Sequence, residues 1–377
     1  MSDVPATLPT APAPEAPAGA RLASAAGRLL PFVAIAIFVL AVGATLAVAG
    51  DTLGYDFRSY YDAASRVLAG QPLYSASAAD TGLNGGFKYP PPFVLPVLPL
   101  ALLPWQAAAW IWVALTLIAF AVGTAVMPVR PAIRWSVLLL AGLSFPFVYA
   151  TKLGQVGSLL YLLFVIGWRW LDRPGVLGAT SAVGALGKVQ PGLVLVWAAL
   201  TGRWRAVFVG GAVLVGMAVV AAIVLGLGTW VDFLALPGRV SDPITTPHNF
   251  TVGAVAYQAG LPRDAASVLQ WASTAGVVAI LVVTALRLPA VPSYLVALIA
   301  SQLLSPILWD HYAMLLLVPV AWLLERGRRW AAVIPLATSV MLVGAIPPVF
   351  YPAAFWVTLA AVALEGARGQ NVVPATR

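Results

Sequence analysis

The chain has 377 residues, of which 61% are hydrophobic and 9% are charged, and its formal net charge is +8. Ordinary soluble domains carry about 25% charged residues, so the composition excludes a soluble domain and indicates an all-α, polytopic membrane protein. The chain has no Cys and only two His, which excludes a disulfide framework or thiolate metal site and argues against a multi-histidine centre.

The N-terminal region is expected to be a disordered cytoplasmic tail over residues 1–28, because it begins with an Ala- and Pro-rich stretch without hydrophobic periodicity. An apolar run follows over residues 29–49. Its end, Ala47-Val48-Ala49, resembles a signal-peptidase site. The run is longer than an ordinary signal-peptide core, so an uncleaved first helix is favoured.

Apolar segments recur through the rest of the chain. Crossing a hydrocarbon core of about 30 Å requires about 20 apolar residues. On this basis the sequence predicts about twelve membrane segments within a membrane domain at 29–364. The expected segments are 29–49, 93–127, 133–150, 156–171, 175–187, 191–200, 205–228, 265–286, 292–308, 311–325, 330–346 and 349–364.

The basic residues between these segments indicate the topology. One set of connections contains only arginines: Arg21, Arg28, Arg130, Arg134, Arg169, Arg173, Arg203, Arg205, Arg287, Arg326, Arg328, Arg329, Arg368 and Arg377. The positive-inside rule places this set in the cytoplasm, with both termini, including a tail at 365–377. The other side then carries a first outer loop at 51–92 and a second at 229–264. This distribution accounts for the net charge without a nucleic-acid partner.

Two places break the regular pattern. Segments 175–187 and 191–200 are each too short to span alone, so we expect two short helices meeting at Lys188-Val-Gln-Pro191. Six prolines between Pro90 and Pro104 predict an irregular or re-entrant entry into the 93–127 segment.

The first outer loop contains an expected amphipathic helix at 56–68, lying at the membrane interface. Asp56 stands at its start and is the candidate catalytic base. The alternative is a helix N-cap, a role that Asp often has. Arg58 is spaced to pair with Asp62 and is also a candidate phosphate ligand.

All three lysines lie on the outer side, each where the chain re-enters the membrane. They occur in three short motifs: Lys88-Tyr89-Pro90, Lys152-Leu-Gly-Gln155 and Lys188-Val-Gln190-Pro191. A lysine at such a point can hold a phosphate as a compact charge, and the alternative is simple snorkelling to the interface. Tyr89, Gln155 and Gln190 are expected to share the binding role.

A further polar turn, Ser305-Pro-Ile-Leu-Trp-Asp310-His311, lies between two apolar segments. His311 could contact a phosphate or share a proton with a carboxylate, and otherwise it is an interfacial histidine. Asp310 is a second acid or a helix cap. In the second outer loop, Pro247–Thr251 is a weak candidate for a lid.

Several absences narrow the function. The sequence has no P-loop, no GxSxG elbow and no D-x-D pair, so a lipid-linked donor is favoured over a nucleotide sugar. No internal repeat was found, which weakens a transporter interpretation. Neither a metal nor a cofactor is indicated.

These motifs resemble glycosyltransferase family 87, in the GT-C superfamily of multispanning transferases. The resemblance rests on Asp56 with Tyr60-Tyr61 and Leu73-Tyr74, on Phe87-Lys88-Tyr89-Pro90-Pro91, on Gly154-Gln155, on Lys188 with Pro191, and on Ser305-Pro306 with Trp309 and His311. Two positions depart from the family pattern. Gly157 stands where the family often has Asn, and Tyr312 stands where it often has a second His.

The resemblance implies a GT-C-type helical bundle in a bacterial inner membrane. It implies transfer of a sugar, typically mannose, from a polyprenyl-phosphate donor to a lipid or glycan acceptor at the periplasmic face. Asp56 would be the base, and the lysines with His311 would stabilise the leaving phosphate. The alternatives are a transporter or flippase of a lipid-linked glycan, and a glycan polymerase or ligase.

Overall fold

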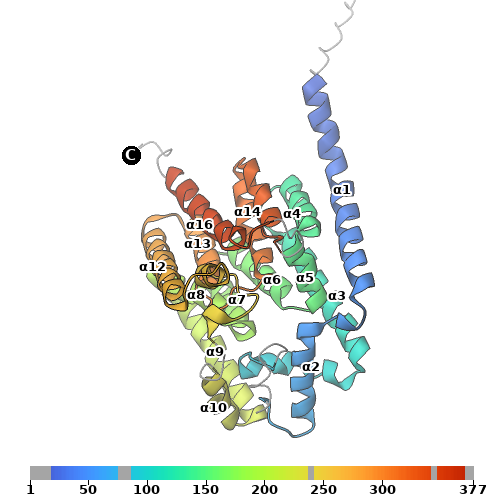
Figure 1. Ribbon diagram of the computed structural model, residues 1–377, viewed down its shortest axis with the longest axis vertical. Coiled ribbons are helices and arrows are strands. Elements are labelled where there is room, and N and C mark those ends of the chain that lie inside the picture. Colours follow the sequence, from blue (N-terminus) through green and yellow to red (C-terminus); the bar gives the residue numbers. More distant parts are fainter. Residues whose placement is uncertain (1–17, 75–85, 237–241, 341–345, 370–377) are drawn as a thin grey trace, which may run out of the picture.

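The computed structural model describes residues 18–74, 86–236, 242–340 and 346–369. Within these ranges every regular element is a helix, which confirms the all-α class (Figure 1). The α-helices are α1 (Ala18–Ala49), α2 (Tyr55–Leu68), α3 (Trp105–Val126), α4 (Pro131–Leu143), α5 (Phe145–Leu153), α6 (Gly157–Arg169), α7 (Pro174–Gly187), α8 (Leu193–Leu200), α9 (Trp204–Leu225), α10 (Gly228–Ala235), α11 (Val252–Gln258), α12 (Arg263–Arg287), α13 (Ala290–Leu303), α14 (Leu317–Glu325), α15 (Val333–Ala337) and α16 (Phe350–Arg368). The 3₁₀ helices are η1 (Gly50–Thr52), η3 (Pro91–Val97), η4 (Leu100–Leu102), η5 (Gln190–Gly192), η7 (Pro243–Thr245), η8 (Tyr312–Leu316) and η9 (Arg329–Ala332).

Five of the described helices are long and apolar enough to cross a membrane: α1 continued to Thr52, α3, α9, α12 and α16. The pair α4 and α5 makes a sixth if its 69° bend lies within one span. The chain is therefore an integral membrane protein. The expected number of about twelve segments is not reproduced by length, because many apolar stretches are cut into short helices such as α6, α8 and α13.

Both termini of the described chain lie at one end of the molecule. In Figure 1 the start of α1 and the end of α16 are at the top, and α2 and α10 are at the opposite end. Arg130, just before α4, pairs with Glu325 at the end of α14 at 2.9 Å, and Arg328 pairs with Glu365 near the end of α16 at 2.8 Å. These arginines belong to the set expected in the cytoplasm, and that orientation stays a prediction from the charge pattern.

The two irregular segments occur where the sequence predicted them. The proline-rich entry forms η3 and η4 before α3 begins at Trp105. The expected break at Lys188 separates α7 from η5 and α8, and Pro191 lies in the first turn after it.

The boundaries of the expected tails differ from the structure. Helix α1 begins at Ala18, inside the stretch expected to be a disordered tail, and α16 continues to Arg368. Residues 1–17 and 370–377 lie outside the described residues, as do 75–85 of the first outer loop and 237–241 of the second.

Helix α2 is the expected helix of the first loop, and it packs on the protein through its apolar face. Phe57 stacks on the rings of Trp105 and Trp112, with ring centroids 5.7 and 5.0 Å away. Tyr60 and Ala64 are also buried on this face. Because this face covers η3, η4 and α3, it fixes the start of α2 against the helical bundle. The interfacial position of α2 stays a prediction.

Candidate active site

Two glycines bring the start of α2 against the end of α5. Gly54 and Gly154 both have positive φ, +73° and +66°, a conformation that glycine adopts without steric cost. The Gly54 N–H donates to the Lys152 carbonyl at 2.8 Å. A Cβ on Gly154 would lie 2.9 Å from the Cβ of Phe57. This close approach places Gln155 beside Asp56.

Asp56 belongs to a polar network that combines three separate segments. The buried Gln155 side chain donates from its amide nitrogen to Asp56 Oδ2. The Tyr60 hydroxyl donates to Gln155 Oε1 at 3.5 Å and lies 2.6 Å from the Tyr89 hydroxyl. Asp56 itself is half-buried. Since the N-cap of α2 is Gly54 and no side chain caps it, the alternative role of Asp56 as a cap is wrong.

The two tyrosines of this network stay protonated at neutral pH. Burial raises the pKa of Tyr60 well above its ordinary value, and the nearby Tyr89 and Asp56 raise it further. Burial likewise raises the pKa of Tyr89. Both phenols therefore act as neutral hydrogen-bonding groups within this network.

The Asp310–His311 turn forms a second polar cluster with unsatisfied atoms. Both side chains are buried, with residue exposures of 6% and 4%. His311 Nδ1 lies 3.4 Å from Asp310 Oδ1, but neither ring nitrogen makes a hydrogen bond. Burial lowers the pKa of His311, and the Lys188 charge adds to this, while Asp310 opposes it. The imidazole is therefore neutral at pH 7, and both of its nitrogens are buried without a hydrogen bond.

The break between α7 and α8 brings two further candidates to this turn. Lys188 Nζ lies 4.0 Å above the centre of the Tyr312 ring, a cation–π geometry. Gln190 donates from Nε2 to the Ser305 hydroxyl at 2.7 Å. Its Oε1 is buried without a hydrogen-bond partner, so a donor from a ligand could satisfy it.

Asn249 fixes the backbone of the Asp310–His311 turn from the second loop. It is fully buried, and its side chain makes four hydrogen bonds to backbone groups. Nδ2 donates to the carbonyls of Pro243 (2.7 Å) and Pro306 (3.1 Å). Oδ1 accepts from the N–H groups of Thr251 (3.0 Å) and Leu308 (2.9 Å). Asn249 thus joins the candidate lid to the turn as a static brace.

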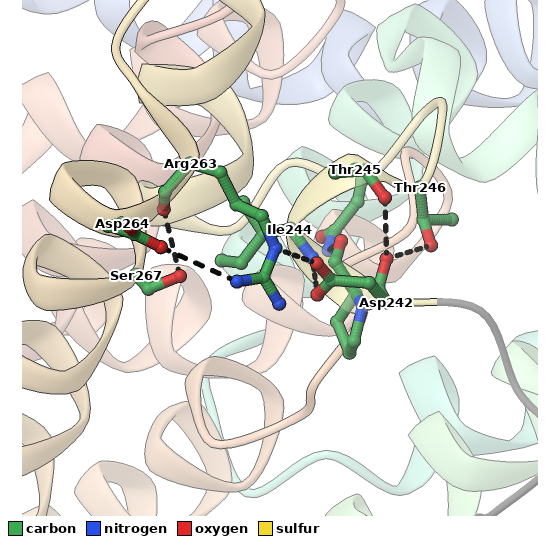
Figure 2. Close-up of polar contacts among 9 residues, drawn as sticks. Asp242, Ile244, Thr245, Thr246, Arg263, Asp264 and Ser267 are labelled. Carbon is green, nitrogen blue, oxygen red and sulfur yellow. Dashed lines mark hydrogen bonds and ion pairs between the residues drawn. The ribbon is translucent and has the colours of Figure 1, made fainter.

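An ion pair fastens the same loop to α12 (Figure 2). The Arg263 Nε donates to Asp242 Oδ2 at 2.5 Å, and the other Asp242 oxygen accepts from the Ile244 N–H at 3.1 Å. The Arg263 guanidinium holds the pKa of Asp242 below its ordinary value. The segment that carries Asn249 is therefore anchored to α12 at Asp242.

The two polar clusters are neighbours, because η8, which follows His311, contacts both α5 and α6. The Asp56 charge acts on the His311 ring, and the Tyr312 hydroxyl acts on Tyr60, so the groups lie within electrostatic range. A close contact explains this arrangement, since a Cβ on Gly157 would lie 2.5 Å from Met314 Sδ. The glycine that departs from the family pattern thus lets η8 pack directly on α6.

Three of the expected residues do not join this group through any described contact. Lys88 is exposed. Lys152 contributes its backbone carbonyl to Gly54. Arg58 pairs with Asp62 at 3.0 Å and lies 4.7 Å from the Trp105 ring centre, on the exposed side of α2.

Sequence reasoning missed two contributors to the site, Tyr312 and Tyr351. The Tyr351 hydroxyl donates to the Trp309 carbonyl at 2.6 Å and accepts from the Ala313 N–H at 3.0 Å. No local signal marks Tyr351, which lies in an apolar segment. Among the described residues, no three His, Cys, Asp or Glu side chains gather into a possible metal site.

Comparison with known proteins adds the family. The sequence model of glycosyltransferase family 87 matches residues 87–308, more than half of the chain. The matched region includes Gln155, Lys188 and Asn249, whereas Asp56 and His311 flank it. No curated protein and no solved structure matches the chain. The chain belongs to glycosyltransferase family 87, and it is a membrane-embedded glycosyltransferase.

Proposed function

We propose that this glycosyltransferase moves a sugar, most simply mannose, from a polyprenyl-phosphate donor to a lipid or glycan acceptor at the outer face of a bacterial inner membrane. The observation that supports it best is the pairing of two complementary clusters. One presents a carboxylate held by Gln155. The other presents Lys188 and an unpartnered imidazole. A sugar phosphate needs both a base for the acceptor and cationic or hydrogen-bonding groups for the phosphate.

In the proposed reaction, Asp56 removes the proton of the acceptor hydroxyl as that oxygen attacks the anomeric carbon. The new carbon–oxygen bond forms as the bond from this carbon to the phosphate oxygen breaks. Polyprenyl phosphate leaves with the electron pair, so its phosphate gains one negative charge. A single displacement inverts the anomeric configuration.

The residues have distinct roles in this reaction. Gln155 orients Asp56 through the described hydrogen bond. Lys188 approaches the leaving phosphate as a point charge, and His311 and Gln190 offer polar atoms that are unpaired in the protein. Lys88, Tyr89 and Lys152 remain proposed contacts to the donor, with Asp310 orienting His311 and Arg58 lying at the entrance.

The test is a transfer assay on the purified, detergent-solubilised protein with labelled polyprenyl-phosphate-mannose and bacterial membrane lipids as acceptors. Asp56→Asn is expected to lower transfer about 10²–10⁴-fold. The matched control is Asp62→Asn, the same change on the exposed side of the same helix, which should stay near the wild-type rate.

Full transfer by Asp56→Asn would contradict its role as base. Transfer from a polyprenyl-phosphate donor with another sugar, and none from the mannosyl donor, would change the sugar and keep the reaction class. Movement of intact lipid-linked glycan across a proteoliposome membrane, without bond cleavage, would instead identify a flippase.

A further inference from the structure

A groove outside the polar clusters runs between α11 and α16. It has a volume of about 340 Å³, and its lining is entirely apolar. Val252, Val255 and Ala256 form one wall, and Pro352, Ala353 and Trp356 form the other. The proposed reaction leaves this groove unused.

Trp356, part of the second wall, packs against α12. The Trp356 indole N–H donates to the Ser273 hydroxyl of α12 at 3.2 Å. A Cβ on Gly276 of the same helix would lie only 3.1 Å from the Trp356 ring, so glycine permits this close packing. Trp356 is therefore held in place by α12.

Both walls begin at residues that hold the Asp310–His311 turn. Tyr351, which bonds the backbone on either side of His311, directly precedes Pro352 of the wall. Phe250, whose N–H donates to the Leu308 carbonyl at 2.9 Å, lies 4.8 Å from Tyr351 between ring centroids. Tyr351 and Phe250 therefore connect the groove walls to the turn that carries His311.

We propose that this groove binds part of the polyprenyl chain of the donor, which rests on the function proposed above. An isoprenoid chain attached to a phosphate at His311 has to leave the polar cluster along an apolar surface. The groove offers such a surface directly beside the turn, and burial of the chain there is favourable. The groove lies on the first two turns of α16, whereas Arg368 at the other end of this helix belongs to the predicted cytoplasmic side. This position fits a lipid whose head group lies on the opposite, outer side.

The test compares two donors with the same sugar phosphate, one carrying a long polyprenyl chain and one carrying a single isoprene unit. Ala353→Trp and Ala256→Trp fill the groove. They are expected to raise the KM for the long-chain donor about tenfold or more and to leave the short-chain donor unchanged. Ala353→Leu fills less space and should give a smaller change in the same direction. The control is Ala360→Trp, at an exposed alanine of α16 outside the groove lining.

A second readout does not depend on transfer. Polyprenyl phosphate with a photoreactive chain should label peptides of α11 and α16 in the wild type and less so in Ala353→Trp. If the wild type transfers no sugar from either donor, the proposed reaction fails. The labelling alone then decides whether the groove binds a polyprenyl chain. The proposal would be overturned if the label were found outside α11 and α16, or if phosphatidylglycerol displaced the photoreactive lipid as well as unlabelled polyprenyl phosphate does. It would also be overturned if the filling variants changed the KM of both donors equally.

Discussion

The two neighbouring polar clusters are built in opposite ways. In the Asp56 cluster the functional side chain is itself held, because Gln155 donates to it and Tyr60 and Tyr89 continue the network. In the His311 cluster the backbone is held and the side chain is left without hydrogen bonds. The first arrangement suits a base whose orientation matters, and the second suits groups that wait for a ligand.

Because of this difference, we expect substitutions in the two clusters to affect the stability of the fold and the rate of transfer differently. Changing a brace of the His311 turn should unfold or displace it, whereas changing His311 itself should remove function at little structural cost. In the Asp56 cluster the supporting side chain should alter the rate without large destabilisation. The following predictions test this contrast from the largest expected effect to the smallest.

Asn249→Ala is expected to have the largest effect. It leaves two carbonyls and two N–H groups without their partner, and each buried unsatisfied group costs about 1–3 kcal/mol. We expect a loss of at least about 3 kcal/mol in unfolding free energy, measured by denaturation in detergent, together with loss of transfer. Gln258→Ala removes a single bond to the Asn249 carbonyl and serves as the control. If Asn249→Ala were as stable as the wild type, the backbone of the His311 turn would not depend on Asn249, and the contrast between the two clusters would fail.

His311→Gln should reduce transfer about 10²–10³-fold, the scale for removing one group that stabilises developing charge. It should also change the pH dependence of stability. Because the pKa of His311 in the folded protein lies below its ordinary value of 6.5, the unfolded chain binds a proton more readily as the pH falls below about 6.5. Stability therefore decreases with acidification in this window and is constant above it.

The measurement is a series of thermal melts between pH 5 and 8, with His311→Gln as the comparison. The variant should lack the decrease that the wild type shows below about pH 6.5. The same slope in both proteins would mean that another group titrates, and that the imidazole is already paired in the resting state.

Gln155→Leu tests the Asp56 cluster. It removes the donor that orients the carboxylate, and a misplacement of about 1 Å can cost about 10²-fold in rate. We expect this loss in kcat, with little change in KM for the donor. Tyr60→Phe, which removes the longer bond to Gln155, should give a smaller loss. An equal loss in both, or an effect on KM alone, would show that Gln155 binds substrate and does not position the base.

Tyr351→Phe is expected to have the smallest effect. It removes the hydroxyl that bonds the backbone around His311, so it should cost about 1–3 kcal/mol and lower transfer severalfold. Tyr294→Phe removes a comparable buried hydroxyl bonded to the Phe164 carbonyl, away from the turn. If the two variants are equally stable but Tyr351→Phe transfers less sugar than Tyr294→Phe, the Tyr351 hydroxyl positions the turn that carries His311.

Much of this architecture was predictable from the sequence. The low charge content, the arginine distribution and the apolar runs indicated an all-α membrane protein, and the prolines indicated where helices break at η3 and before Pro191. The family was also recognisable from short motifs, because Lys88-Tyr89-Pro90-Pro91 and Gly154-Gln155 keep their order and lie in the matched region.

The contacts between side chains in the two polar clusters were not predictable from the sequence. The hydrogen bond from Gln155 to Asp56 depends on the positive φ of Gly54 and Gly154 and on how closely their backbones approach, which a sequence pattern does not encode. Tyr351 carries no local signal, since its role follows from the packing of α16 against a turn 38 residues earlier. The three lysines looked equivalent, yet only Lys188 reaches the turn by a described contact.

The brace by Tyr351 has a consequence for biogenesis. Asp56 lies in α2, early in the chain, but the neighbouring turn is held by Asn249 and finally by a hydroxyl of α16, the last described helix. In the proposed reaction, activity therefore requires α16 to be made and packed against this turn. A ribosome that stalls before residue 351 would leave an inserted chain whose acid is in place and whose neighbouring turn lacks its clamp.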